Sequence, residues 1–215
     1  ACPRVRYSRS PAFVNPLFPL TSMAVFTPVS DDDARALLAH FDLGEFVSLR
    51  GITAGIENTN YFLYTSRGEY VLTLFEVLTQ AQLPFYIELM YHLASRGIPV
   101  PQPQTLRDGT RLTTLHGKPC AIVSRLPGGY EPAPGAAHCA LAGATLARAH
   151  VAARDFPIRQ PNLRGLSWWV ETAPKVLPFL EPGQAQLLQS DLAAQQAAAT
   201  SPAWQSLPAG PAHCD

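Results

Sequence analysis

The hydrophobic and polar positions of the chain follow two different periods, and the change falls near residue 125. Before it, short runs rich in β-branched and aromatic residues alternate with turn residues, as at 46–50, 61–65 and 70–75. Such runs are typical of strands. After it, from His138 onward, leucines and small residues recur at the spacing of a helix. The pattern predicts a β-rich first part and a helical second part.

Two helices are predicted beside these strands. Ser30 precedes three aspartates, a pattern that caps a helix and places negative charge at its positive end, so a helix is expected over 31–41. A second helix is expected to begin at Pro84 and to end at Gly97, because proline suits a first turn and glycine suits a C-terminal cap. One side of this helix is expected to carry Phe85, Leu89 and Leu93.

Turn residues place the remaining strands. Asp108-Gly109 and His116-Gly117 are predicted hairpin turns, which separate strands at 104–107, 110–115 and 119–124. Residues 51–60 are expected to form a polar loop between the first two strands. The predicted fold class is therefore α+β: an antiparallel sheet of about five strands with one packing helix, followed by a mainly helical lobe.

Composition divides the chain into four predicted segments. A natural-looking start lies at Met23, so residues 1–22 are expected to be a non-native upstream extension. Its arginines, without any acid, resemble a targeting peptide, but its prolines break both an apolar core and an amphipathic helix. Residues 23–126 are expected to form an N-terminal lobe, 127–135 a linker, and 136–215 an incomplete helical lobe.

The overall composition narrows the class of protein. Hydrophobic residues make up 47% and charged residues 15%, which is typical of a globular protein, and Lys plus Arg equal Asp plus Glu at 16 each. No nucleic-acid or membrane partner is therefore expected. The four cysteines have neither metal-ligand spacing nor the density of a secreted scaffold. They indicate reduced thiols and a cytoplasmic setting, while the oligomeric state is not readable.

Two segments could bind a nucleotide. In the 51–60 loop, glycines such as Gly55 allow a close backbone approach, and Asn58 and Asn60 can donate to phosphate oxygens. At the end of the 119–124 strand, the backbone of Ser124, Arg125 and Leu126 could bind the edge of an adenine. Each segment could equally be a plain connector, because glycine and asparagine are common turn formers.

The last residues carry the candidate chemistry. Phosphoryl transfer to an alcohol needs a carboxylate that accepts the hydroxyl proton, and Asp215 is the candidate for that role. His213 is expected to fix its loop by hydrogen bonds, although an untied chain end with an incidental His and Asp is the alternative. Trp168 and Trp169 are expected to pack in the helical lobe rather than to stack on a ligand.

A string of collinear segments then gives a family resemblance. These segments are 23–28, 42–44, 50–52, 55–62, 70–76, 83–89, 97–101, 117–119, 138–139, 143–150, 161–162 and 165–166. With them the chain, from Met23 to Asp215, resembles the bacterial homoserine kinases of the aminoglycoside-phosphotransferase-like type, within the protein-kinase-like superfamily.

The resemblance implies ATP-dependent phosphorylation of the L-homoserine hydroxyl, a step towards threonine, with ATP and Mg²⁺ as cofactors. It implies a bilobal fold in which Asp215 is the catalytic base and Glu88 helps to order the phosphate site. The segments over the phosphates and around adenine would contain Gly55, Glu57, Asn58, Asn60, Ser124, Arg125 and Leu126.

The chain departs from the family pattern in two ways. Thr73 stands where many relatives in the wider superfamily place a Lys or Arg that pairs with the α- and β-phosphates, so Glu88 lacks its expected partner or lies on a solvated helix face. The family's magnesium ligands fall after Asp215, so none is assigned here. The chain as given is expected to be inactive and to leave Leu141, Leu146 and Val151 without packing partners.

Two alternatives stay open. The alcohol could be choline, a sugar amine or an aminoglycoside, because the residues that read the substrate would follow Asp215. The chain could also be a non-catalytic nucleotide-binding or interaction module.

Overall fold

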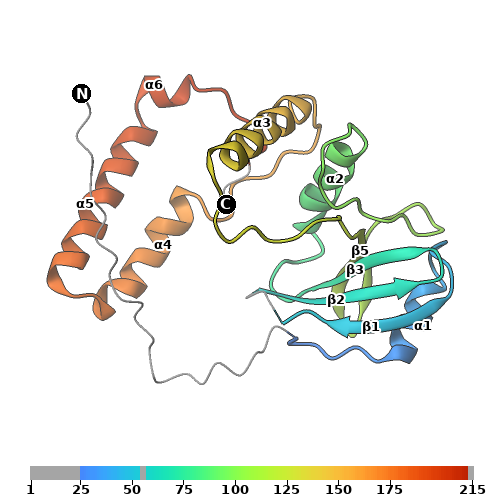
Figure 1. The fold of residues 1–215 in the computed structure, drawn as a ribbon. Helices are drawn as coiled ribbons and strands as arrows, with labels where there is room; N and C mark the ends of the chain where they lie inside the picture. Colours follow the sequence, from blue (N-terminus) through green and yellow to red (C-terminus); the bar gives the residue numbers. More distant parts are fainter. Residues whose placement is uncertain (1–24, 54–56, 213–215) are drawn as a thin grey trace.

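The computed structural model describes residues 25–53 and 57–212, which form a sheet-containing part and a helical part joined by an extended segment (Figure 1). Gly55, His213, Asp215 and the predicted extension 1–22 lie outside the described residues. In chain order the helices and strands are α1 Asp31–Leu38, β1 Phe46–Gly51, β2 Asn58–Thr65, β3 Gly68–Phe75, α2 Leu83–Ala94, β4 Thr113–Leu115, β5 Lys118–Ser124, α3 Ala136–Ala152, α4 Leu166–Val176, α5 Pro182–Ala199 and α6 Pro202–Gln205.

The sheet has five strands in the order β1-β2-β3-β5-β4, and every neighbouring pair is antiparallel. This confirms the predicted α+β fold class. The predicted turn at His116-Gly117 closes the β4–β5 hairpin, because Leu115 pairs with Lys118 and both turn residues have positive φ, 51° and 72°.

The prediction of a strand at 104–107 is wrong. This segment makes only isolated bridges, Pro103 with Val123 and Leu106 with Phe41. Pro101 and Pro103 have no backbone N–H, so a continuous ladder beside β5 cannot form there. The strand predicted at 110–115 is shortened to β4, since Thr110 is held in the preceding turn by Asp108, whose Oδ1 accepts from its backbone N–H at 2.9 Å.

The polar loop between the first two strands is also shorter than predicted. Asn58 pairs with Phe75 and Asn60 with Thr73, so both asparagines belong to β2 rather than to the loop. The backbone N–H of Ile52 donates to the carbonyl of Asn60 at 2.9 Å and extends the β1–β2 pairing. The two side chains are therefore fixed on one face of the sheet.

Helix α1 covers the other face of the sheet and builds the core. Ser30 caps the helix as predicted: its hydroxyl accepts from the backbone N–H of Asp33, and the Asp33 carboxylate accepts from the backbone N–H of Ser30. The helix ends at Leu38 rather than at the predicted Phe41, whose backbone bridges to Leu106 instead. One cluster of buried side chains joins helix and sheet and includes Leu37, Leu38, Phe41, Leu63, Leu72 and Ile122.

Helix α2 contacts the sheet part and also the residues that follow α3. Its buried residues are Leu83 and Ile87, so the predicted packing side is partly wrong. Phe85 instead lies edge-on to Phe156, at 5.8 Å between ring centroids. The His92 imidazole is 2.9 Å from the carbonyl of Ala152, so α2 ties the sheet part to the helical part.

The helical part exposes much apolar surface. The described structure of α3 and α5 contains no fully buried residue, and Leu141 and Val151 are 67% and 56% exposed. Trp168 and Trp169 line an apolar pocket of about 340 Å³ with Leu188 and Leu192 of α5, and they are 38% and 40% exposed, so they are only partly packed. Among the described residues no helix is long and apolar enough to cross a membrane.

Candidate functional site

The face of the sheet opposite α1 is only half-covered along its centre. In an antiparallel sheet, directly paired residues point to the same face. Along β2, odd-numbered residues are buried in the core and even-numbered residues are half-buried. Register then places two rows across β2, β3 and β5 on this face: Asn60, Thr73 and Ala121 in one row, and Phe62, Val71 and Val123 in the next. The β5 members, Ala121 and Val123, are buried, at 1% and 8% exposed, whereas the members on β2 and β3 are half-buried.

The first row presents polar groups beside the β1–β2 loop. The Thr73 hydroxyl donates to the Asn60 side-chain oxygen at 2.7 Å, and the Asn60 amide nitrogen donates to the carbonyl of Asn58 at 3.3 Å. The amide of Asn60 is thereby oriented. One of its two N–H groups is left over within the described structure. An anion at this edge of the sheet would meet a donor that is already held in place.

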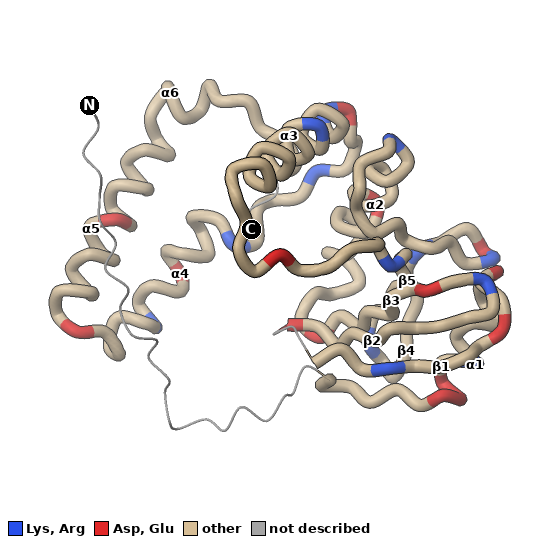
Figure 2. The backbone as a smooth tube through the Cα atoms, viewed as in Figure 1, with Lys and Arg blue, Asp and Glu red and all other residues tan. Residues whose placement is uncertain are grey.

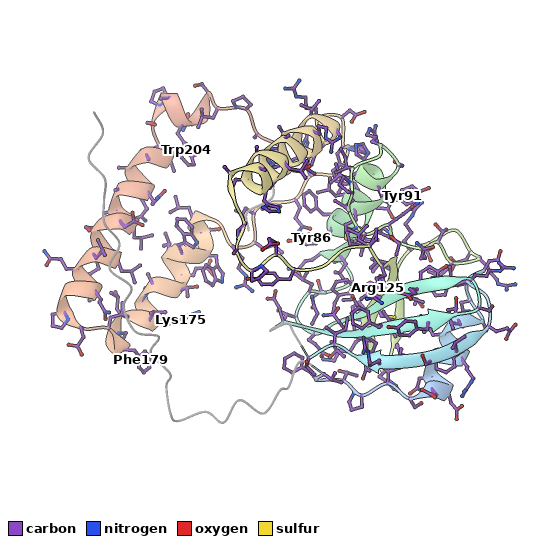
Figure 3. The ribbon with its side chains drawn as sticks, viewed as in Figure 1. Tyr86, Tyr91, Arg125, Lys175, Phe179 and Trp204 are labelled. Atoms are coloured by element: carbon purple, nitrogen blue, oxygen red, sulfur yellow. The ribbon has the colours of Figure 1, made fainter. Side chains whose placement is uncertain are left out.

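The second row is apolar and flanked by cations. The guanidinium carbons of Arg50 and Arg125 lie 5.1 Å and 4.5 Å from the centroid of the Phe62 ring. Arg125, labelled in Figure 3, is also bound to Glu69, at 2.7 Å between Nη1 and Oε2. Its side chain is therefore engaged with the sheet. A flat aromatic ligand that lies on Phe62 would therefore have to share this ring with the two guanidinium groups.

The segment after β5 supplies free backbone groups next to this row. The backbone N–H of Ser124 donates to the carbonyl of Gln102 at 2.9 Å, so it is occupied. The backbone N–H of Arg125 donates to the carbonyl of Glu69 at 3.3 Å. The N–H and carbonyl of Leu126 have no hydrogen-bond partner in the part of the chain that the structure describes. The backbone N–H and carbonyl of Leu126 could therefore form hydrogen bonds with the edge of a ligand on the apolar row.

Glu88 has a partner that the sequence did not reveal. Both of its carboxylate oxygens accept from Nη1 of Arg111, at 3.0 Å and 2.9 Å. The Arg111 guanidinium carbon lies 3.5 Å from the ring centroid of Tyr91, the α2 residue labelled in Figure 3. The Glu88 side chain is 35% exposed, and its ion pair is with Arg111 rather than with a residue of β3. The cation beside α2 comes from the segment before β4.

Arg111→Lys is expected to lower the free energy of unfolding by about 2 kcal/mol, because a compact ammonium cannot contact the Glu88 carboxylate and cover the Tyr91 ring together. The Arg111 side chain is only 17% exposed, so water can make few contacts in place of those that the substitution removes. Urea denaturation measures it, with Arg148→Lys on exposed α3 as the control, for which we expect no more than about 0.5 kcal/mol. Equal effects would contradict the assigned role of Arg111.

Glu57 connects the sheet part to the helical part. Its Oε1 lies 2.6 Å from Nη2 of Arg164, which is 107 residues further along the chain. The Arg164 guanidinium carbon lies 5.2 Å from the ring centroid of Trp168. Glu57 immediately precedes β2, so this ion pair brings a cation of the helical part to the edge of the polar row.

The remaining titratable groups form no metal cluster in the described structure, and the buried cysteine is unreactive. Burial raises the pKa of the Cys120 thiol to about 12, so this cysteine stays protonated and inert. Cys120 and Cys139 are both free thiols. Among residues 25–53 and 57–212, no group of three or more His, Cys, Asp or Glu side chains could hold a metal ion. Lys and Arg are mixed with Asp and Glu over both parts (Figure 2).

The structure thus brings some predicted site residues together and leaves others apart. Asn60 and Thr73 touch, and Asn58 shares their strand edge, whereas Glu88 is engaged by Arg111. Sequence reasoning missed the apolar row and the two arginines 111 and 164. A signal for the row existed, since Phe62 follows Asn60 by two residues and Val71 precedes Thr73 by two.

Comparison with known proteins gives a consistent result. The phosphotransferase enzyme family matches residues 48–215. The chain is 55% identical over 193 residues to the homoserine kinase of Paraburkholderia xenovorans (strain LB400) and 54% identical to that of Burkholderia mallei (strain SAVP1). Each alignment covers 90% of this chain and 58% of the relative, so the chain spans less than two thirds of their length.

Two solved structures share the fold. A spectinomycin phosphotransferase in complex with ADP and spectinomycin matches with a TM-score of 0.54 at 15% identity, over 80% of this chain and 55% of that one. An amicoumacin kinase in complex with AMP-PNP and Ca²⁺ matches with a TM-score of 0.56 at 16% identity, over 84% of this chain and 55% of that one.

Proposed function

The chain belongs to the phosphotransferase enzyme family, and from that premise we propose that the complete protein is an ATP-dependent homoserine kinase. The observation that carries the proposal is the 55% identity to a homoserine kinase over 193 residues. The product, a phosphorylated homoserine, serves threonine biosynthesis. A cytoplasmic setting goes with this activity, because the free thiols Cys120 and Cys139 suit a reducing compartment.

In this proposal the half-buried face of the sheet binds ATP. The adenine lies on the row of Phe62, Val71 and Val123, with its edge at the free backbone groups of Leu126. The phosphates lie at the other end of the face, where Asn60 and Asn58 donate hydrogen bonds. The apolar row provides contact area, and the oriented amides provide direction for the charged end.

Asp215 is the proposed catalytic base. It accepts the proton of the homoserine hydroxyl as that oxygen forms a bond to the γ-phosphorus and the bond from the γ-phosphorus to the β–γ bridging oxygen breaks, releasing ADP. The proposed role of His213 is to hold the loop that carries Asp215. Mg²⁺ would neutralise charge on the phosphates when bound. The described residues contain no group of three or more His, Cys, Asp or Glu side chains that could hold it.

The direct test is an ADP-release assay on the complete protein, expressed from its whole reading frame. L-homoserine is expected to give the highest kcat/KM, ahead of choline, an amino sugar and an aminoglycoside. A preference for one of these other alcohols would reassign the substrate and keep the kinase. Binding of ATP without phosphorylation of any of them would favour a non-catalytic nucleotide-binding module.

Asn60→Asp is expected to raise the KM for ATP at least about 10-fold, because a donor facing the phosphates becomes a like charge. The carboxylate still accepts the hydrogen bond from Thr73, so the sheet is expected to stay folded. Gln189→Glu, which adds the same charge at an exposed position of α5, is the control and should leave the KM unchanged. An unaltered KM in Asn60→Asp would remove Asn60 from the phosphate site.

A further inference from the structure

The Glu57–Arg164 ion pair is too exposed to contribute much to the stability of the fold. The two side chains are 48% and 62% exposed, and exposed ion pairs add little to stability. The backbone of Arg164 is nonetheless fixed by the residues next to it in the chain. Its backbone N–H donates to the side-chain oxygen of Asn162 at 2.9 Å, and Gly165, the N-cap of helix α4, follows directly after it. The turn presents the guanidinium towards the start of β2.

The charge of Glu57 would oppose phosphate binding at this place. Glu57 precedes Asn58 by one residue and Asn60 by three, and these two amides are the proposed phosphate donors. A carboxylate next to a bound triphosphate weakens the binding of that triphosphate, because the two negative charges repel each other. Arg164 neutralises that carboxylate through Nη2, while its Nη1 and Nε have no partner in the described part of the chain. An arginine can bind a phosphate through two N–H groups at once.

Other arginines on this face are also engaged, but the Arg164 side chain, which contacts Glu57 and the Trp168 ring, is 62% exposed against 36% for Arg125. Arg50 lies over the Phe62 ring, and Arg125 is shared between the same ring and Glu69. Thr73, in the centre of the polar row, carries no charge. Arg164 is thus a cation that reaches the polar row from the helical part.

We propose that Arg164 is a phosphate-binding residue for the nucleotide and that Glu57 competes with the phosphate for its guanidinium. The proposal rests on the proposed function, since it takes the nucleotide to be the ligand of this face. Glu57 then sets an upper limit on nucleotide affinity, and Arg164 supplies the charge that Thr73 does not.

Calorimetric binding of ADP to the complete protein tests this competition. Arg164→Gln is expected to weaken ADP binding about 10-fold or more, the usual effect of losing a charged hydrogen bond. Glu57→Gln is expected to tighten it about 3-fold, because a competing charge is removed. The double variant should bind ADP more tightly than Arg164→Gln, because the repulsion by an unpaired Glu57 is removed, but still more weakly than the wild type, because the guanidinium is missing. Adenosine, which lacks phosphates, should bind every variant alike. Arg159→Gln, an exposed arginine of the same segment, is the matched control.

Three results would overturn the proposal. Unchanged ADP binding by Arg164→Gln would remove the residue from the phosphate site. A double variant restored to the wild-type affinity would mean that Arg164 acts only by neutralising Glu57. A raised KM for L-homoserine with unchanged ADP binding would assign Arg164 to the substrate carboxylate.

The outcomes also separate this proposal from the proposed function. If the binding pattern holds but L-homoserine is not phosphorylated, the assigned substrate fails and the role of Arg164 stands. If L-homoserine is phosphorylated and Arg164→Gln binds ADP normally, only the role of Arg164 fails. A wild-type protein that binds no ADP would overturn both.

Discussion

Asp215→Asn in the complete protein is expected to lower kcat for L-homoserine phosphorylation by about 10³-fold, with little change in the KM for ATP. An amide has nearly the shape of the carboxylate but cannot accept the hydroxyl proton, and a positioned general base contributes roughly 10²- to 10⁴-fold to rate. The apolar row and the polar row, which are proposed to bind the nucleotide, lie elsewhere in the chain, so nucleotide binding should survive. Steady-state ADP release with varied ATP separates kcat from KM.

The control for this substitution is Asp191→Asn, which removes a carboxylate from α5, outside the proposed site. It should leave kcat within about 2-fold, because it touches no group assigned to the reaction. His213→Asn should fall between the two, near about 10-fold, if His213 holds the loop rather than transfers a proton. An Asp215→Asn enzyme that keeps a tenth or more of the wild-type kcat would show that another group accepts the proton.

Local sequence signals predicted the elements that local interactions create. Ser30 was readable as a cap because its partner, Asp33, is three residues away. His116-Gly117 was readable as a hairpin turn because its backbone conformation is decided within the turn itself. The segment 104–107 misled because Thr105 and Leu106, directly before the Asp108-Gly109 turn, imitate a strand. Its neighbouring prolines remove ladder donors, and only bridges to β5 and Phe41 remain.

The candidate site was predictable residue by residue but not as an arrangement. Asn60 and Thr73 were each singled out, yet their contact depends on the β2–β3 register, which the length of the intervening turn decides. The two ion pairs of the site could not be predicted from the sequence. Arg111 is 23 residues from Glu88, and Arg164 is 107 residues from Glu57. No local pattern links partners at such separations without an alignment or a structure.

The absence of a cation at Thr73 changes how the site should be understood. A hydroxyl at this position orients Asn60 by a 2.7 Å hydrogen bond, so the polar row carries oriented dipoles and no fixed charge. Positive charge is brought from elsewhere. Arg111 neutralises Glu88 on α2, and Arg164 neutralises Glu57 at the start of β2. Each acidic residue near the half-buried face that sequence reasoning had singled out thus has its own arginine.

The core face of the sheet holds a polar network that should dominate stability. Thr59 is fully buried, and its hydroxyl accepts from the backbone N–H groups of Phe26 and Thr27 at 2.9 Å and 3.1 Å. The same hydroxyl donates to Glu76 at 2.7 Å. Nζ of Lys118 lies 3.0 Å from the second carboxylate oxygen of Glu76, so one threonine connects the N-terminal segment, β2, β3 and β5.

Thr59→Val is therefore expected to lower the free energy of unfolding by about 3 kcal/mol near pH 7. Valine fills the same volume but leaves two backbone N–H groups without an acceptor and deprives Glu76 of a donor, and each buried unmet group costs about 1–3 kcal/mol. Thr114→Val, at an exposed position of β4, is the matched control and should change stability by no more than about 0.5 kcal/mol. Urea denaturation of the complete protein measures both variants.

The pH dependence of the Thr59→Val effect gives a sharper signature. Burial raises the pKa of Glu76, but the hydrogen bonds from Thr59 and Thr27 and the Lys118 ammonium outweigh it, so the net pKa lies below its ordinary 4.5. A depressed carboxyl pKa stabilises the fold above the unfolded value, and this stabilisation is lost as the pH falls through the folded value. Without the Thr59 hydroxyl the pKa of Glu76 moves back up towards its ordinary value. The variant therefore loses less stability than the wild type when Glu76 is protonated. The difference in stability between wild type and Thr59→Val should therefore narrow as the pH falls below 4.5, and a difference that stays constant or widens would disprove the role of Glu76.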